Sequence, residues 1–319
     1  MLPAGRFTQL NKASSRAVAI KSRILISKPM TNTIDSSKPS YQIGVDIGGT
    51  KINAVLLKDK IVVESNKLAT PTDNLNHFII IFKAAVEPLF EHAAKAGGRV
   101  DFLGIGVPGT VNQHAGRVIT CTNLPILDNL KLLSKLRTDL NLNLPMKLDN
   151  DANCFVRAEA LLGAGQDVAN LYGVTLGTGI GGGWWFNGEI YHGSHGGAGE
   201  ICDMLIDLDN KITLEQAYKK LTQNNPRLLA QEAYEGDILA EKSFQELGAY
   251  LGMAFANIAN LLDPELIIIG GGASASSDLF LATAQKAMKK HLASKESKKI
   301  SIVKSKLGTN AGAIGAALI

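Results

Sequence analysis

The stretch Leu176-Gly-Thr-Gly-Ile-Gly-Gly-Gly183 and its shorter counterpart Asp46-Ile-Gly-Gly-Thr-Lys51 indicate how this chain folds. Each follows a short apolar segment that is typical of a buried strand, 171–176 in one case and 41–47 in the other. Each also precedes a second strand-like segment, so each reads as a glycine-rich hairpin. Because the same glycine-rich hairpin follows an apolar strand twice, the chain is expected to form two duplicated α/β lobes, with a cleft between them.

The rest of the sequence alternates between strand-like and helical patterns, and an antiparallel meander opens each half. Short apolar runs predict strands at 41–47, 52–57, 61–68, 102–107, 146–148, 171–176, 184–188 and 266–269. Apolar residues at helical spacing predict helices at 75–90, 127–140, 152–162, 244–262 and 311–318. The fold class that follows is α/β with two lobes.

The predicted domain organisation has three parts. Residues 1–40 show little periodicity, and we interpret them as a disordered extension or as upstream sequence from a wrong start, with Met30 as the alternative start. A first lobe is expected at 41–152, with the C-terminal helix 305–319 packing back on it. The second lobe is expected at 153–304.

Composition and charge exclude several classes of protein. Of the 319 residues, 45% are hydrophobic and 19% are charged, which is typical of a globular chain. No apolar run approaches the roughly 18–20 residues of a membrane-spanning helix, so we expect no membrane partner. The net charge of +4 arises in residues 1–40, which hold seven Lys or Arg and one acid, while 41–319 carry −2. The body therefore lacks the basic surface of a nucleic-acid-binding protein.

The three cysteines, Cys121, Cys154 and Cys202, have no CxxC spacing. A sparse, odd count argues against a disulfide framework and favours a reducing compartment. The expected location is the cytoplasm.

The second glycine-rich stretch contains G-x-G-x-x-G at Gly177, Gly179 and Gly182. A dinucleotide-binding loop of this type must open a helix, whereas Trp184 and Trp185 continue this one as a strand. NAD binding is therefore excluded. The hairpin can still present bare backbone N–H groups to phosphate oxygens, with the hydroxyl of Thr178 beside them; otherwise it is a structural turn.

The first glycine-rich stretch adds a carboxylate to the same device. Asp46 is placed to hold Mg²⁺, directly or through water, while Gly48, Gly49 and Thr50 approach phosphate. This fits the usual way of binding Mg²⁺, which is held by one or two carboxylates together with substrate phosphates.

Polar residues follow the strand at 146–148 and open the next helix. Asp151 is a candidate proton acceptor for a substrate hydroxyl, and Asp149 is expected to be structural. The alternative interpretation of an Asp or Asn here is a helix N-cap.

The stretch 191–203 carries His192, His195, Glu200 and Asp203. A metal site is conceivable on composition, but without a tight set of Cys or His ligands zinc is disfavoured. A glycine-rich loop that displays Glu200 to a polyol fits better.

These stretches, taken in order, resemble the ROK family (repressor, open reading frame, kinase) of sugar kinases, within the actin-like ATPase superfamily. The resemblance runs from about residue 41 to residue 319 and implies that family's two-lobed, ribonuclease H-like fold. It implies Asp151 as the catalytic residue. The residues that it assigns to ATP and Mg²⁺ are Asp46, Gly48, Gly49, Thr50, Lys51, Gly177, Thr178, Gly179, Gly270, Gly271 and Gly272. The residues that it assigns to the sugar are Gly109, Asn123, Asn150, Asp151, Glu200, Asp203 and Glu215.

Two departures from the family pattern concern zinc. Asp203 stands where the family often has a His that contacts both the sugar and a structural zinc. The Cys-rich zinc segment is missing as well, since the chain passes directly from 207–211 to 212–218. No zinc is therefore expected, although Glu215, which read alone is a solvated acid, still matches the end of that segment.

The resemblance implies ATP-dependent phosphorylation of a hexose or an N-acylhexosamine at the C6 hydroxyl, by a homodimer that uses Mg²⁺. Three alternatives remain open: a regulator of the same family, a sugar-binding sensor with catalysis altered at Asp203, and a kinase that uses polyphosphate. The regulator would need an N-terminal helix-turn-helix, for which residues 1–40 are too short and patternless.

Overall fold

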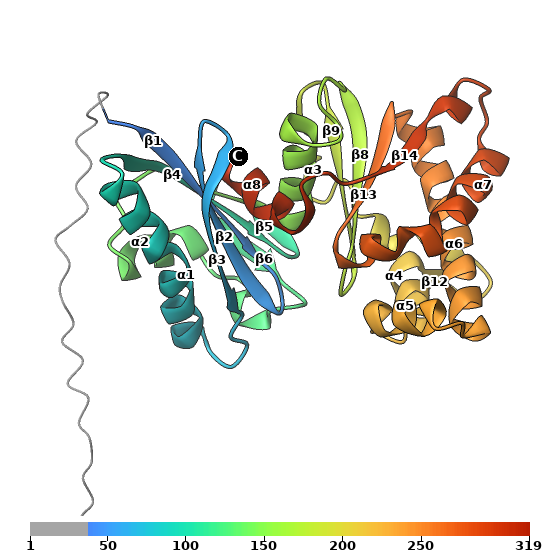
Figure 1. Cartoon of the computed structure of the whole chain (residues 1–319), viewed down its shortest axis with the longest axis horizontal. Helices are drawn as coiled ribbons and strands as arrows, with labels where there is room; N and C mark the ends of the chain where they lie inside the picture. Colours follow the sequence, from blue (N-terminus) through green and yellow to red (C-terminus); the bar gives the residue numbers. More distant parts are fainter. Residues whose placement is uncertain (1–37) are drawn as a thin grey trace, which may run out of the picture.

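The computed structural model describes residues 38–319, which form two halves with the same sheet topology (Figure 1). The strand order is β3-β2-β1-β4-β7 in the first sheet and β10-β9-β8-β13-β14 in the second. In both sheets, the first three strands are antiparallel neighbours and the last two are parallel to the central strand. The predicted α/β class with two hairpin-led lobes is confirmed. The extension predicted at 1–40 lies outside the described residues except for its last three.

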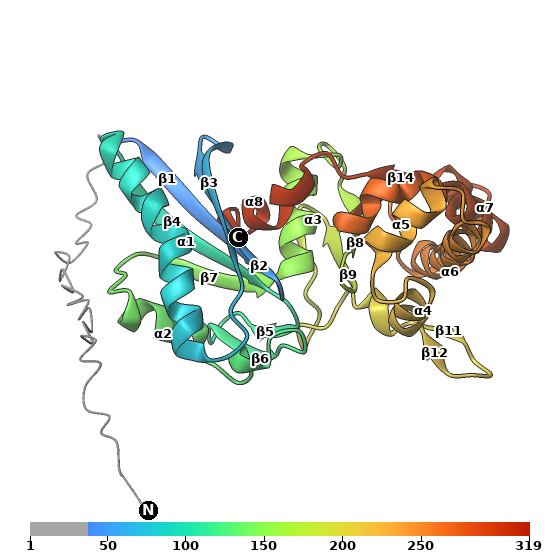
Figure 2. The ribbon, with the colours of Figure 1, turned by 60° about the horizontal axis from the view of Figure 1, so that its bottom comes forward.

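The first half is built on its sheet, with two helices on one face and a small hairpin at one end (Figure 2). Its strands are β1 (Ser40–Ile47), β2 (Lys51–Lys58), β3 (Ile61–Ala69), β4 (Arg99–Val107) and β7 (Met146–Asn150), and the hairpin is β5 (Thr110–Asn112) and β6 (Arg117–Thr120). Its helices are α1 (Leu75–Lys95) and α2 (Leu132–Asp139). Phe78, Phe82 and Leu89 of α1 are fully buried against the apolar face of the sheet.

The second half places its helices on the side of the sheet that faces away from the first half (Figure 1). Its strands are β8 (Asn170–Leu176), β9 (Ile180–Phe186), β10 (Glu189–Ile190), β13 (Leu266–Gly270) and β14 (Ser301–Lys304). The helices are α4 (Leu214–Leu221), α5 (Pro226–Tyr234), α6 (Ile238–Leu262) and α7 (Leu281–His291), and a hairpin of β11 (Leu205–Asp207) and β12 (Ile212–Thr213) precedes α4. Phe244, Phe255 and Phe280 centre this core.

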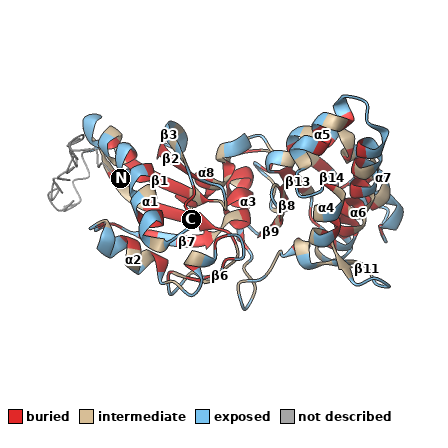
Figure 3. Ribbon diagram, turned by 90° about the horizontal axis from the view of Figure 1, so that it is seen from below, coloured by how far each residue is buried: buried red, intermediate tan, exposed pale blue. Residues whose placement is uncertain are grey.

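Two helices, α3 (Asp151–Leu162) and α8 (Ala311–Ala317), lie between the sheets and are almost entirely buried (Figure 3). Glycines allow this close packing. A Cβ on Gly104 of β4 would lie 1.7 Å from the carbonyl oxygen of Ala316, and one on Gly315 would lie 1.7 Å from that of Cys154. On the other side of α3, a Cβ on Gly181 of β9 would come within 3.0 Å of the Ala152 Cβ. The start of α3 is therefore held between both sheets.

The structure corrects three predicted element boundaries. The helix predicted at 127–140 begins only at Leu132, because Asn129 adopts a left-handed backbone (φ 56°) and its N–H bonds back to Ile119. The helix predicted at 244–262 begins at Ile238, since the Asp237 side chain caps its N-terminus. The strand predicted at 184–188 begins at Ile180, so half of the second glycine-rich stretch belongs to β9.

Within residues 38–319, no helix combines the length and the apolar character that crossing a membrane requires.

Candidate active site

The site is assembled where parallel strands of the first sheet end. Asp46 at the end of β1 pairs in register with Gly106 of β4, which pairs with Asp149 of β7. The carboxyl ends of parallel strands are the usual place for ligands in open α/β sheets. Asn150 then caps α3 by accepting a hydrogen bond from the Asn153 N–H (3.1 Å), and Asp151 is the first residue of the helix. The predicted N-cap is therefore Asn150, which leaves the Asp151 side chain available.

Asp151 has an unusual electrostatic environment. Burial raises the pKa of its carboxyl, and the negative charge of Glu200 raises it further, to about 6, although a hydrogen bond from the Ala152 N–H (2.9 Å) opposes the shift. A carboxylate with such a pKa is a stronger base than an ordinary Asp and still ionised at neutral pH. Asp151 is therefore suited to accept a proton.

Asp46 lies next to the same charge. Burial and the negative charge of Asp151 raise the pKa of Asp46 to about 7, against the positive charge of Lys67. The sequence did not indicate Lys67: it lies on the same face of the sheet as Asp46, two strands away, because Asp46 pairs with Asn53 across β1 and β2, and Asn53 pairs with Lys67 across β2 and β3. The back of the carboxyl group is closed by α8, since a Cβ on Gly312 would lie 2.6 Å from Asp46 Oδ2.

The first glycine-rich hairpin is a tight turn that leaves its tip open. The Gly48 N–H donates to the Lys51 carbonyl (2.9 Å), and the Thr70 hydroxyl donates to the Gly48 carbonyl (2.7 Å). Thr50 and Lys51 are exposed. A Cβ on Gly49 would lie 3.3 Å from the carbonyl oxygen of Asn123, which places Asn123 beside the hairpin.

The second hairpin is held from below by α4. The Gly177 N–H donates to the Gly179 carbonyl (2.9 Å), and the Tyr218 hydroxyl donates to the Gly177 carbonyl (2.7 Å). The Ile180 N–H donates to Glu215 Oε2 (2.7 Å), and a Cβ on Gly179 would lie 2.6 Å from Glu215 Oε1. Gly177 has open space beside it, and the neighbouring Thr178 is exposed, so the outer face of the hairpin is free.

The glycine segment after β13 lies against the second hairpin. Gly271 has φ +81°, and a Cβ there would lie 2.3 Å from the carbonyl oxygen of Leu176, the residue before Gly177. Gly270 packs on the Phe155 ring, and Gly272 opens a 3-10 helix over Gly272–Leu279 with free space beside it. The structure thus brings the two predicted nucleotide segments of the second half together.

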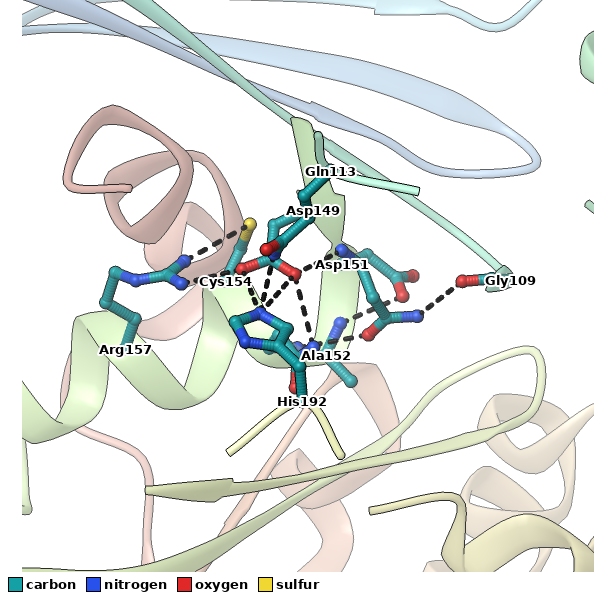
Figure 4. A network of polar contacts seen from close by, with 10 residues as sticks. Gly109, Gln113, Asp149, Asp151, Ala152, Cys154, Arg157 and His192 are labelled. Atoms are coloured by element: carbon teal, nitrogen blue, oxygen red, sulfur yellow. Dashed lines mark hydrogen bonds and ion pairs between the residues drawn. The ribbon is translucent and has the colours of Figure 1, made fainter. Parts of the chain in front are cut away.

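Beside Asp151 lies a network of polar and charged groups that is centred on the fully buried Asp149 (Figure 4). Its carboxylate pairs with Arg157 Nη2 at 2.6 Å and lies 3.2 Å from His192 Nε2. Gln113 Nε2 lies 2.6 Å from the same His192 nitrogen. Burial alone would raise the pKa of Asp149, but His192 and Arg157 outweigh it and lower the pKa to about 2. Asp149 is thus the structural carboxylate, as predicted, while the parts played by Arg157 and Gln113 were not foreseen.

Several residues assigned to the sugar contact one another or share a neighbour. Asn150 donates its side-chain N–H to the Gly109 carbonyl (3.0 Å), and both lie at the strand ends beside Asp151. Glu200 is close enough for its charge to raise the pKa of Asp151, and burial and the charge of Asp203 raise its own pKa. Glu215 accepts the Ile180 N–H and pairs with Lys219 at 2.8 Å, and burial together with the charges of Glu200, Asp203 and Glu215 raises the pKa of the Cys202 thiol.

Few of the described side chains are arranged to bind a cation. Among residues 38–319, no three His, Cys, Asp or Glu side chains come together as a metal-binding group. The β11–β12 hairpin spans the segment where the resemblance would place a zinc loop, and its turn is closed by Asp207 accepting hydrogen bonds from Asn210. Asp46 and Asp151, by contrast, are two neighbouring carboxylates beside a glycine hairpin, which fits Mg²⁺ held together with phosphates.

The chain is similar in sequence to proteins of one family. The ROK family model matches residues 42–319. The chain belongs to the ROK family. It is 30% identical over 309 residues to an N-acetyl-D-glucosamine kinase of Mannheimia succiniciproducens, covering 86% of this chain and 98% of that one.

Solved structures of the ROK family show the same fold. A ROK glucokinase from Streptomyces griseus in complex with glucose and AMPPNP has 29% identity and a TM-score of 0.74, with 87% of this chain and 98% of that chain covered. A ROK transcriptional regulator, a homologue of the E. coli MLC protein, has a TM-score of 0.75 at 24% identity and covers 88% of this chain and 77% of its own, which shows the fold alone. The expected actin-like ATPase fold is confirmed.

Proposed function

We propose that this protein is a MgATP-dependent sugar kinase that phosphorylates a hexose or an N-acylhexosamine at its C6 hydroxyl. The observation that carries the proposal is the position of Asp151: it lies at the start of α3, held between the two sheets, with Asp46 and Glu200 near it and its pKa raised to about 6. The names of the relatives support the same reaction, since one is an N-acetyl-D-glucosamine kinase and another is a glucokinase with bound glucose and an ATP analogue.

In the proposed reaction, Asp151 accepts the proton of the sugar hydroxyl as its oxygen forms a bond to the γ-phosphorus and the bond to the β-phosphate oxygen breaks. Phosphoryl transfer depends mainly on positioning and on charge neutralisation. The backbone N–H groups of Gly49 and Gly179 would hold the phosphates, together with Thr50, Lys51 and the Thr178 hydroxyl, while the Gly48 and Gly177 N–H groups close the two turns. Bound Mg²⁺ supplies positive charge to the transferred phosphoryl group, and Asp46 is the residue that would hold it, directly or through water. The adenosine would lie along Gly270–Gly272.

Asn150, Glu200 and Asn123 would bind the sugar hydroxyls, with Gly109 and Asp203 at the same pocket. A site built from such groups discriminates between sugars, because a missing hydroxyl leaves a polar partner unpaired. Asp203 adds a negative charge beside Glu200, and this raises the pKa of Glu200.

Further proposals concern assembly and location. We infer a first lobe of residues 41–152 with the helix at 305–319 and a second lobe of 153–304, because each sheet carries its own apolar core and α8 packs on β1 and β4. We also propose a cytoplasmic homodimer; the three free cysteines support the compartment, and the family resemblance is the basis for the dimer.

The test is release of ADP from MgATP by the purified protein with glucose, fructose, mannose, N-acetylglucosamine, N-acetylmannosamine and allose, each tested separately. Removal of the general base should lower turnover by about 10²–10⁴-fold in Asp151→Asn while sugar affinity, measured by calorimetry, changes little. ADP release with one sugar that is lost in this variant establishes the kinase and its substrate. Sugar binding without ADP release would instead favour a sensor.

A further inference from the structure

The loop at 191–200, which presents Glu200, has little structure of its own. Gly193, Gly196 and Gly199 all have positive φ, between 69° and 95°. One end of the loop is fixed within the second half, because the Tyr172 hydroxyl donates to the Gly199 carbonyl (2.6 Å). The other end is bound to β9 at its first residue, because the Tyr191 N–H donates to the Trp184 carbonyl (2.8 Å), and His192 follows it.

The His192 side chain crosses to the first half of the molecule. Its Nε2 lies 3.2 Å from both carboxylate oxygens of Asp149 on β7 and 2.6 Å from Gln113 Nε2, between β5 and β6 (Figure 4). Depending on its tautomer, Nε2 donates to Asp149 or accepts from Gln113. Either arrangement ties the loop to the first half.

The carboxylate of Asp149, which His192 contacts, is held in place by other side chains. Asp149 is fully buried, and Arg157 Nη2 at 2.6 Å and Asn153 Nδ2 at 3.2 Å hold its carboxylate in place. It is also only two residues before Asp151 in the chain. A group bound to Asp149 is therefore positioned relative to Asp151 through the backbone that joins β7 to α3.

A backbone contact supports the same docking. A Cβ on Gly196 would lie 3.2 Å from the carbonyl oxygen of Val111 in β5, so the middle of the loop rests on the hairpin that follows Gly109. Glu200, at the far end of the loop, then lies close enough to Asp151 for their charges to interact.

We propose that His192 is a positioning residue that latches the 191–200 loop onto Asp149 and so sets Glu200 opposite Asp151 around the sugar. This inference rests on the proposed sugar kinase activity. The proposal predicts an effect on sugar binding and none on ATP binding. The contact of His192 orders a sugar-binding loop, whereas neither glycine hairpin forms a hydrogen bond with His192 within the described residues.

The kinetic test compares His192→Phe, which keeps a planar ring without nitrogen, with His192→Gln, which keeps a hydrogen-bonding amide. His195→Phe is the matched control, because His195 lies in the same loop, is exposed and makes no hydrogen bond within the described chain. His192→Phe should raise the KM for the sugar about tenfold, as expected for the loss of one hydrogen bond to a charged group, and leave the KM for ATP unchanged. His192→Gln should restore most of the sugar KM, and His195→Phe should behave as the unsubstituted protein.

A second measurement does not depend on activity. Hydrogen exchange of the backbone amides at 193–200 should be faster in His192→Phe than in the unsubstituted protein and unchanged in His195→Phe, with the strands of both sheets unaffected. The same exchange and the same sugar KM in His192→Phe would overturn the latch. If the unsubstituted protein phosphorylates no sugar, the kinase proposal fails, and the exchange comparison alone decides whether His192 holds the loop.

Discussion

The carboxyl group of Asp151 lies close enough to Asp46 to raise its pKa. Burial is the largest cause of this shift and the negative charge of Asp151 is the second, and the resulting pKa of Asp46 is about 7. Two like charges, one at the end of β1 and one at the start of α3, are costly unless a cation lies near them. Among the described groups, Lys67 is the one whose positive charge lowers the pKa of Asp46. The pair is therefore suited to a further cation, which is the reason to assign Mg²⁺ to this end of the first sheet.

Asp46→Asn should lower kcat by about 10²-fold, because it removes a preorganised charge at the transferred phosphoryl group. The concentration of Mg²⁺ that gives half-maximal activity should rise as well. Steady-state rates across a Mg²⁺ titration at saturating sugar and ATP measure both. The control is Asp59→Asn, in the exposed turn between β2 and β3, where φ is +51° and Asn is equally tolerated. An unchanged Mg²⁺ dependence in Asp46→Asn would remove Asp46 from the cation site.

The raised pKa of Asp151 predicts how activity depends on pH. The general base must be ionised, so at saturating MgATP, where the bound cation keeps Asp46 ionised, kcat/KM for the sugar should fall about tenfold per pH unit below pH 6 and level off above it. Glu200→Gln removes a negative charge that raises this pKa, so the acidic limb of the profile should move to lower pH. The profile is measured with sugar well below its KM, where it reports the free enzyme.

Asp203→Asn is the comparison for this experiment. The charge of Asp203 acts on Glu200 rather than on Asp151, so its removal should shift the acidic limb less than Glu200→Gln does. An acidic limb that stays in place in Glu200→Gln would show that the two carboxyl groups are not coupled.

Two different roles can be expected for Glu215. The resemblance assigns it to the sugar, whereas the structure has it accepting the Ile180 N–H at the base of the second glycine hairpin. Glu215→Ala leaves that N–H unpaired, which costs about 1–3 kcal/mol if it stays buried. We therefore expect a rise in the KM for ATP, with the sugar KM nearly unchanged, in initial-rate measurements that vary each substrate in turn.

Lys219→Ala controls for the ion pair that Glu215 makes at 2.8 Å, because that pair is partly exposed and contributes little. It should leave both KM values close to those of the unsubstituted protein. A rise confined to the sugar KM in Glu215→Ala would mean that this carboxylate binds the sugar after all.

The sequence predicted the fold and the two hairpins because both depend on local patterns. Glycine between apolar strands specifies a hairpin whatever surrounds it, and Asn150 before a helical segment specifies a cap. These signals are contained in a few consecutive residues, so they can be read without knowing the tertiary structure.

The Asp149 network could not be predicted in the same way. Gln113, Asp149 and His192 come from three separate segments, and only the packing of α3 between the sheets brings them together. His192 was noticed as a possible metal ligand, but its partner is a carboxylate that is 43 residues away in the sequence. Lys67 was missed for a related reason, because its position on the same face of the sheet as Asp46 depends on the register of three strands.

Gly271 lies in the segment that we propose for adenosine and packs against the second hairpin, with a positive φ (+81°) and a backbone carbonyl next to it. In Gly271→Ala the new Cβ would lie 2.3 Å from the Leu176 oxygen, so Leu176 and the adjoining Gly177 must shift. The matched control is Gly188→Ala, which has a similar φ (+87°) and open space around its Cβ, and which therefore carries only the backbone cost of about 1–2 kcal/mol. The free energy of unfolding, measured in urea, should fall more in Gly271→Ala than in Gly188→Ala. Only Gly271→Ala should raise the KM for ATP. If both variants lose the same free energy of unfolding and keep the same KM for ATP, close packing of Gly271 on Leu176 does not shape the nucleotide site.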